Sequence, residues 1–142
     1  MSLIDSLYPQ TLVKVRKFLD ACHAVGLDVR VYSGYRSFAE QARLYQAYQD
    51  GTGPRAAPPG SSFHNVRRAV DFLCYRGGLP IERGDDPDYG KAGEIAEKCG
   101  LAWGGRWNHP DFDHVEDEEC VTCGIEVGPK GASHFDETGE HA

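Results

Sequence analysis

A short apolar segment with a carboxylate at its centre constrains the fold of this chain more than any other feature. Residues 69–75 read AVDFLCY, a composition typical of a buried strand. Asp71 lies in the middle of this segment. An unpaired carboxylate inside a protein is energetically expensive, so the fold must bring partners to Asp71 from elsewhere in the chain.

The remaining sequence alternates between helical and strand patterns. Helices are predicted over residues 9–25, 38–48 and 89–99. The second helix begins with the capping box Ser37-Phe38-Ala39-Glu40. Strands are predicted over 27–32, 69–75 and 112–116, and the Gly- and Pro-rich residues 50–62 form a long loop. This order predicts an α+β fold with a small antiparallel sheet flanked by helices.

Composition limits the classes of function. The 142 residues suit one domain, predicted over 1–118, followed by an irregular C-terminal extension over 119–142. A net charge of -7 argues against nucleic-acid binding. The sequence has no pattern typical of a signal peptide or a membrane span, so we expect the protein to be synthesised in the cytoplasm and not to bind membranes. We also expect a monomer. The five cysteines are interpreted mainly as free thiols.

Two regions carry residues suited to metal chemistry. His64 precedes Asp71 by seven positions, and His114 follows Asp111 by three. Two imidazoles and one carboxylate with an open fourth position are a ligand set of catalytic zinc, and a spare carboxylate can accept a proton from water. Six histidines and 22 acidic residues also allow such a combination by chance. The residues alone therefore leave ordinary surface roles open.

Three motifs in order resemble a known family of zinc peptidases (peptidase family M15). The family includes D-Ala-D-Ala carboxypeptidases and dipeptidases and the L-alanyl-D-glutamate endolysins of phages. Residues 62–71 resemble its S-x-H-x-x-G-x-A-x-D signature, and Ser33-Gly34-Tyr35-Arg36-Ser37 with Gln41 resembles its upstream element. The sequence GGRW at 104–107, followed by DFDHVE at 111–116, resembles the closing element of its phage-type branch.

The resemblance implies a fold, a cofactor and residue roles. His64, Asp71 and His114 would bind Zn²⁺ on the antiparallel sheet of a fold like that of DD-peptidases and Hedgehog domains. Asp111 would be the general base, and Arg36 would stabilise negative charge on the scissile carbonyl. The substrate would be a peptidoglycan stem peptide or a D-Ala-D-Ala-type peptide. An endolysin-like protein would act on the cell wall after release or in a virion.

Several positions leave alternatives open. Arg67 occupies the glycine position of the signature, so a catalytically inactive zinc-binding member serving as a wall-binding or structural module is one alternative. A glycoside hydrolase that uses Asp71 and Asp111 without metal is another. Arg36 alternatively pairs with an acidic neighbour, and Asp111 alternatively belongs to a turn.

The remaining candidate residues have less specific interpretations. We expect Asp113 to be solvated, and Glu116 either to orient a metal ligand or to be solvated. Trp103, Trp107 and Tyr35 are interpreted as packing residues. Cys120 and Cys123, with the downstream His134 and His141, are weighed as a structural zinc site against ordinary thiols in a polar tail.

Overall fold

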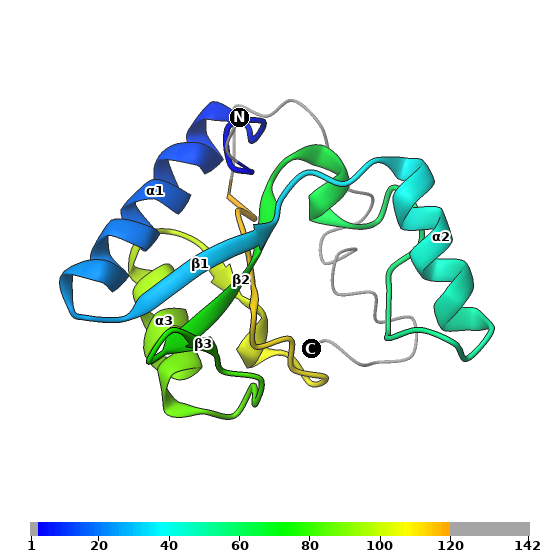
Figure 1. The fold of residues 1–142 in the computed structure, drawn as a ribbon. Coiled ribbons are helices and arrows are strands. Elements are labelled where there is room, and N and C mark those ends of the chain that lie inside the picture. The colour runs from blue at the N-terminus through cyan, green and yellow to red at the C-terminus, as the bar shows by residue number, and fades with distance from the viewer. Residues whose placement is uncertain (1–2, 120–142) are drawn as a thin grey trace.

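The computed structural model describes residues 3–119 and shows an α+β fold (Figure 1). The helices are α1 (Pro9–Ala24), α2 (Phe38–Gln49) and α3 (Pro87–Lys98), with short 3-10 helices η1 (Phe63–Val66) and η2 (Gly104–Arg106). The strands are β1 (Asp28–Ser33), β2 (Ala69–Arg76), β3 (Leu79–Pro80), β4 (Ala102–Trp103) and β5 (His114–Glu116). The three predicted helices and three predicted strands are confirmed, with small shifts at their ends.

All paired strands of the sheet are antiparallel, as predicted. The strand order is β1-β2-β5-β4, and β3 pairs with β2. The two-residue strands β3 and β4 were not predicted, because a period of two is not visible in so short a segment. The last strand begins at His114 rather than at 112, because residues 112 and 113 form a turn.

Helices α1 and α3 cover one face of the sheet. Phe72 of β2 lies between them, with its ring centroid 5.3 Å from that of Phe18 and 5.8 Å from that of Tyr89. Val70, Cys74 and the residues around them belong to the same buried cluster. Because successive side chains of a strand point to opposite faces, Asp71 projects from the face of β2 opposite to this core.

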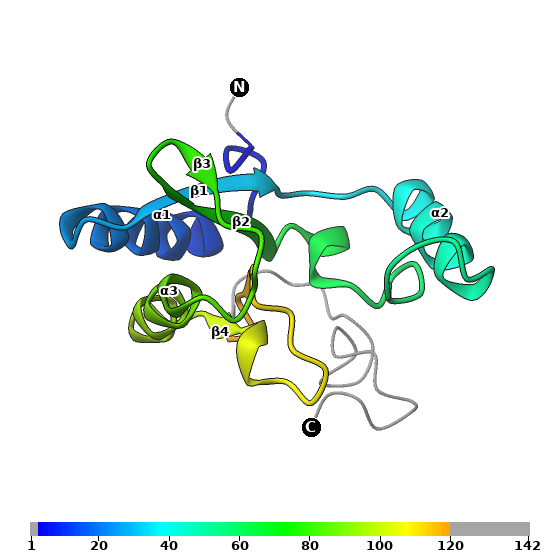
Figure 2. The same cartoon turned by 60° about the horizontal axis from the view of Figure 1, so that its bottom comes forward.

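Helix α2 lies apart from the sheet (Figures 1 and 2). The Ser37 hydroxyl accepts a hydrogen bond from the Glu40 backbone N–H at 3.1 Å, which confirms the predicted cap. The Glu40 carboxylate pairs with Arg43. Segment 34–37 connects β1 to α2.

The ends of the chain lie partly outside the described residues. The predicted extension 119–142 is described only at Glu119, so the interpretations of Cys120, Cys123, His134 and His141 stay predictions. Cys22, Cys74 and Cys99 are free thiols. None of the helices within 3–119 is long and apolar enough to cross a bilayer.

The position of Phe72 between two helices predicts a large effect of its truncation. Phe72→Ala should lower the free energy of unfolding by about 3–5 kcal/mol, because it removes buried surface and leaves a cavity. Leu79→Ala is the matched control: Leu79 is 71% exposed, so a change within about 0.5 kcal/mol is expected. Urea denaturation measures both, and similar values for the two variants would contradict the described core.

Candidate metal centre and active site

Asp71 and His114 face each other across two neighbouring strands. Antiparallel pairing of β2 and β5 places Asp71 opposite His114 and Ala69 opposite Glu116. His114 Nδ1 is 3.0 Å from Asp71 Oδ1, and His114 Nε2 is 2.7 Å from Glu116 Oε1. Glu116 is fully buried, so the interpretation as a solvated carboxylate is wrong and its contact orients His114.

His64 approaches the same carboxylate from outside the sheet. It lies in η1, where the Ser62 hydroxyl accepts a hydrogen bond from the His64 backbone N–H at 3.2 Å. His64 Nδ1 is 2.8 Å from the Gly34 carbonyl oxygen, and His64 Nε2 is 3.3 Å from Asp71 Oδ2. Segment 34–37, η1 and β2 therefore meet at Asp71.

The three predicted ligands form a group that fits a divalent metal. His64, Asp71 and His114 each offer one donor atom, and these atoms lie within 4.8 Å of one another. In each imidazole, the nitrogen farther from Asp71 contacts another oxygen: His64 Nδ1 contacts the Gly34 carbonyl, and His114 Nε2 contacts Glu116. The other nitrogen of each ring faces Asp71. Such oriented histidines with one carboxylate suit catalytic zinc.

The protonation of the cluster follows from its burial and its contacts. Burial opposes the ionisation of Asp71, but His64 and His114 hold its pKa well below the usual range. Burial also opposes the charge of His114, yet its hydrogen bonds to Asp71 and Glu116 raise its pKa well above the usual value. Burial raises the pKa of Glu116, against the effect of His114. The positive charge that these contacts favour on His114 therefore stabilises the ionised carboxylate of Asp71.

Arg36 lies beside the cluster in a fixed position. Its Nη2 is 3.5 Å from Asp71 Oδ2, and its Nη1 donates to Gln41 Oε1 at 2.8 Å. Its backbone N–H donates to the His64 carbonyl at 3.1 Å, and Asn65 Nδ2 donates to the Arg36 carbonyl at 2.8 Å. The guanidinium thus pairs with an acidic neighbour and also lines the pocket.

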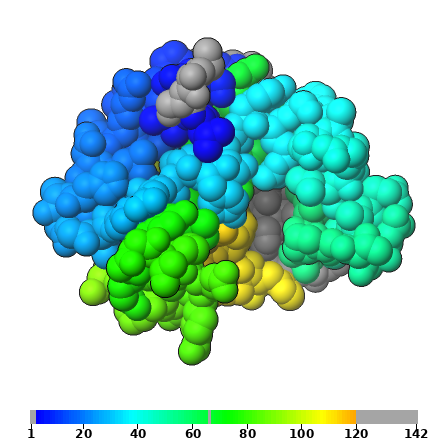
Figure 3. Space-filling view, in the orientation of Figure 1, coloured from blue at the N-terminus to red at the C-terminus, as the bar shows by residue number. Residues whose placement is uncertain are grey.

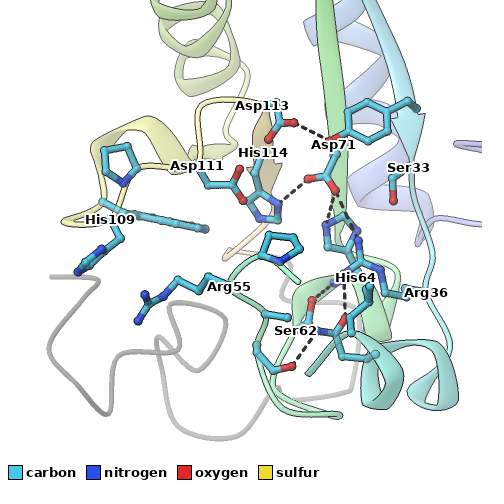
Figure 4. Close-up of a pocket in the computed structure, with 18 residues that line it drawn as sticks. Ser33, Arg36, Arg55, Ser62, His64, Asp71, His109, Asp111, Asp113 and His114 are labelled. Carbon is cyan, nitrogen blue, oxygen red and sulfur yellow. Dashed lines mark hydrogen bonds and ion pairs between the residues drawn. The ribbon is translucent and has the colours of Figure 1, made fainter. Parts of the chain in front are cut away.

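Asp111 lies in a turn and points its carboxyl into the pocket (Figure 4). The turn is held by the Asp111 N–H, which donates to the Gly104 carbonyl at 2.9 Å. A side chain on residue 104 would place its Cβ 2.5 Å from the Asp111 carbonyl oxygen, so this position requires glycine. Desolvation and a hydrogen bond with Asp113 raise the pKa of Asp111 to about 8.

Asp113 is half-buried and has a side-chain partner, so it is only partly solvated. Tyr32 donates its hydroxyl to Asp113 Oδ2 at 2.5 Å, and both residues line the pocket. The prediction assumed strand alternation from residue 112, whereas β5 begins only at His114. Because Asp113 lies in the preceding turn, its side chain reaches the pocket beside Asp111.

These residues line a pocket of about 700 Å³. From outside, it is visible as a hollow between β1 and the segment after α2 (Figure 3). Trp107, interpreted from sequence as a packing residue, lines it with its ring centroid 5.2 Å from that of His114. Sequence reasoning missed Tyr32, Arg55 and His109, which also line the pocket; the long loop was the only signal for Arg55.

Arg67 adopts the backbone conformation that the motif glycine would favour. Its φ is 65°, in the left-handed region. The guanidinium stacks 4.0 Å from the centroid of the Tyr35 ring, and Nη1 donates to the Ser6 carbonyl at 3.1 Å. The ligands still converge, so the substitution leaves the predicted site intact.

The sequence matches the profile of the VanY family, described as D-alanyl-D-alanine carboxypeptidase, over residues 5–114. The chain therefore belongs to this family of peptidases. Among individual proteins, it resembles the peptidoglycan L-alanyl-D-glutamate endopeptidase CwlK of Bacillus subtilis, with 32% identity over 102 residues. The match covers 64% of this chain and 61% of CwlK, so it spans less than two thirds of that relative.

Solved structures show the same fold. The L-Ala D-Glu endopeptidase ChiX of Serratia marcescens matches with a TM-score of 0.63 and 21% identity, covering 80% of this chain and 82% of ChiX. A VanY D,D-pentapeptidase mutant from the VanB-type resistance cassette, in complex with Zn(II), matches with a TM-score of 0.60 and 18% identity, covering 90% and 76%. The family membership gives no support to the glycoside hydrolase alternative.

Metal uptake should release protons from the site. His114 Nδ1 faces Asp71 and Nε2 faces Glu116, and these contacts raise the pKa of His114 well above its usual value. A metal held by His64, Asp71 and His114 would therefore displace a proton from His114. Calorimetric titration with Zn²⁺ at pH 7 in buffers of different ionisation enthalpy should show release of about one proton per metal ion. Because His114 has a raised pKa, affinity should strengthen as pH rises toward that pKa. Proton-independent binding would contradict the proposed donor atoms.

The stacked arginine predicts a contrast between two substitutions. Arg67→Ala keeps the left-handed strain and loses the stack, so it should destabilise the protein by about 0.5–1 kcal/mol. Arg67→Gly loses the stack but relieves strain, and should be the more stable variant. Thermal unfolding compares the two, and zinc content should stay unchanged in both. Loss of zinc in Arg67→Gly would show that Arg67 supports the ligands directly.

Proposed function

We propose that this protein is a zinc-dependent peptidase that hydrolyses an amide bond in peptidoglycan stem peptides. The observation that carries the proposal is the convergence of His64, Asp71 and His114 on one point beside a pocket. Family membership supports the same reaction class. Bound Zn²⁺ would supply a Lewis acid for the scissile carbonyl and for water.

The chain's own residues would carry the proton and charge transfers. The Asp111 carboxylate, which lines the pocket beside the metal ligands, would accept a proton from the attacking water and return it to the leaving amine. Arg36, held by Gln41, would donate hydrogen bonds to the carbonyl oxygen as negative charge develops. The contacts of His64 with the Gly34 carbonyl and of His114 with Glu116 would keep both imidazoles oriented toward the metal.

The scissile bond is proposed from the relatives. CwlK is an L-alanyl-D-glutamate endopeptidase, which favours the L-Ala–D-Glu bond in this chain as well. The family profile and the solved complex of VanYB with D-Ala-D-Ala favour the terminal D-Ala–D-Ala bond as the second candidate. The two candidates are separated by mass spectrometry of the fragments released from purified peptidoglycan.

The biological setting is a further part of the proposal. The G-G-x-W and D-x-x-H-x-E pattern at 104–116 supports an endolysin-like protein that acts on the cell wall after release or in a virion. The protein is proposed to act as a monomer. Lysis of intact cells from outside would support this setting. Light scattering during gel filtration tests the monomer.

Two substitutions separate metal binding from catalysis. His64→Ala should lose both the zinc and the cleavage, because it removes a ligand. Asp111→Asn should keep the zinc and lower the cleavage rate by about a hundredfold to ten-thousandfold, because it removes the proton acceptor. Zinc analysis and release of amino groups from peptidoglycan measure the two properties.

His23→Ala serves as the control, because His23 contacts the Val29 carbonyl outside the pocket. It should keep both zinc and cleavage. Zinc in the wild type without cleavage of any wall peptide would favour the inactive binding module. Full cleavage by Asp111→Asn would remove Asp111 from the mechanism.

A further inference from the structure

The pairing of β1 with β2 contains a bulge at Tyr32. Val31 pairs with Phe72, and the next pair along the strands is Ser33 with Asp71, so Tyr32 is the extra residue of β1. A bulge bends a strand and redirects the side chain that it carries. Val31 packs against the core, whereas Tyr32 and Ser33 both line the pocket. The bulge therefore places two consecutive side chains of β1, rather than one, on the pocket side of the sheet.

The Tyr32 hydroxyl holds the side chain of Asp113. It donates to Asp113 Oδ2 at 2.5 Å, and a phenol keeps its proton near neutral pH. Figure 4 shows the Asp113 carboxylate joined to this hydroxyl, whereas the Asp71 carboxylate is joined to His64 and His114. The hydroxyl thus fixes the direction of a carboxylate that immediately precedes a predicted metal ligand in the sequence.

Asp113 lies close enough to the metal site to compete for the metal. One oxygen from each of Asp71, Asp111 and Asp113 lies within 4.8 Å of the others, and Asp71 also belongs to the predicted ligand set. The Asp113 backbone is held by the Phe72 N–H, which donates to its carbonyl at 2.8 Å, so only the side chain needs to turn. A carboxylate that reaches Zn²⁺ would occupy the position that catalytic sites keep open for water or substrate.

We propose that Tyr32 is a positioning residue that keeps the Asp113 carboxylate away from the open coordination position of the metal. The inference rests on the proposed function, because it requires His64, Asp71 and His114 to bind the metal. The hydrogen bond from Tyr32 stabilises Asp113 in its observed direction, and a short bond to a carboxylate is among the stronger kinds. Without this bond, Asp113 would bind the metal at a lower cost in free energy.

The test removes the hydroxyl and measures metal affinity. Tyr32→Phe should bind Zn²⁺ about tenfold more tightly in competition with a chelator, because Asp113 becomes a fourth protein ligand. Cleavage of peptidoglycan should fall about tenfold or more, because the open position is occupied. A merely structural role of the hydroxyl would loosen the metal instead. Weaker or unchanged zinc affinity in Tyr32→Phe would therefore overturn the proposal.

A second substitution decides whether Tyr32 acts through Asp113. Asp113→Asn keeps the size of the side chain but replaces the carboxylate with an amide, which is not among the usual ligands of zinc. In the Asp113→Asn background, Tyr32→Phe should change zinc affinity and cleavage by no more than about twofold. The same effect of Tyr32→Phe in both backgrounds would overturn the proposal, because the hydroxyl would then act without Asp113.

Tyr75→Phe is the matched control, because it removes a phenol hydroxyl from the same sheet. Tyr75 lies outside the pocket lining, and the guanidinium carbon of Arg30 is 4.0 Å from its ring centroid. Zinc affinity and cleavage should both stay at the wild-type level. An equal tightening of zinc binding in Tyr75→Phe would overturn the assignment to Tyr32.

A spectroscopic measurement separates this inference from the proposed function. Co²⁺ in place of Zn²⁺ reports its ligands through visible absorption, whether or not the protein cleaves a peptide. If the wild type binds Co²⁺ but cleaves no wall peptide, the proposed activity fails, and the spectra decide on Tyr32. A spectrum that changes in Tyr32→Phe, but not when the same substitution is made in the Asp113→Asn background, would support the positioning role. Identical spectra of the wild type and Tyr32→Phe would overturn it, and a wild type that binds no metal would overturn both proposals.

Discussion

The buried carboxylate of Asp71 is the constraint on which the rest of the site depends. Such a group is expensive inside a protein unless charged or hydrogen-bonding partners surround it. Here His114 comes from the opposite strand, His64 from η1 and Arg36 from the segment before α2. A register slip of one residue between β2 and β5 would turn His114 toward the core and leave Asp71 with fewer partners. The correct pairing of β2 with β5 and the assembly of the site therefore depend on each other.

The sequence predicted those helices and strands whose residues follow a clear period. The apolar stripe of α1 and the run of β2 are long enough for their periods to be visible, and Ser37 provides a capping signal. The strands β3 and β4 have two residues each and carry no period. The beginning of β5 was misplaced because a turn residue and a strand residue look alike in a segment as short as 112–116.

The site was predictable to the extent that its residues lie in motifs. His64, Asp71, His114, Arg36 and Asp111 were named from spacing and family resemblance, and the structure brings all five to one pocket. Tyr32 was assigned to the polar side of β1, without any sign that this side faces the pocket. Arg55 and His109 lie in non-repeating segments, where position depends on hydrogen bonds such as that between Gln41 and Ala57. Such contacts have no sequence period.

The side chain of Gln41 links the segment that carries Arg36 to the long loop that follows α2. Its oxygen accepts from Arg36, and its nitrogen donates to the backbone of the loop that carries Arg55. Gln41 is almost fully buried, so it cannot turn to solvent when one partner moves. Insertions or deletions in that loop would therefore shift the position of the Arg36 guanidinium. Substitutions on the two sides of the pocket should consequently be epistatic, and a change of substrate preference during evolution would require coordinated replacements rather than independent ones.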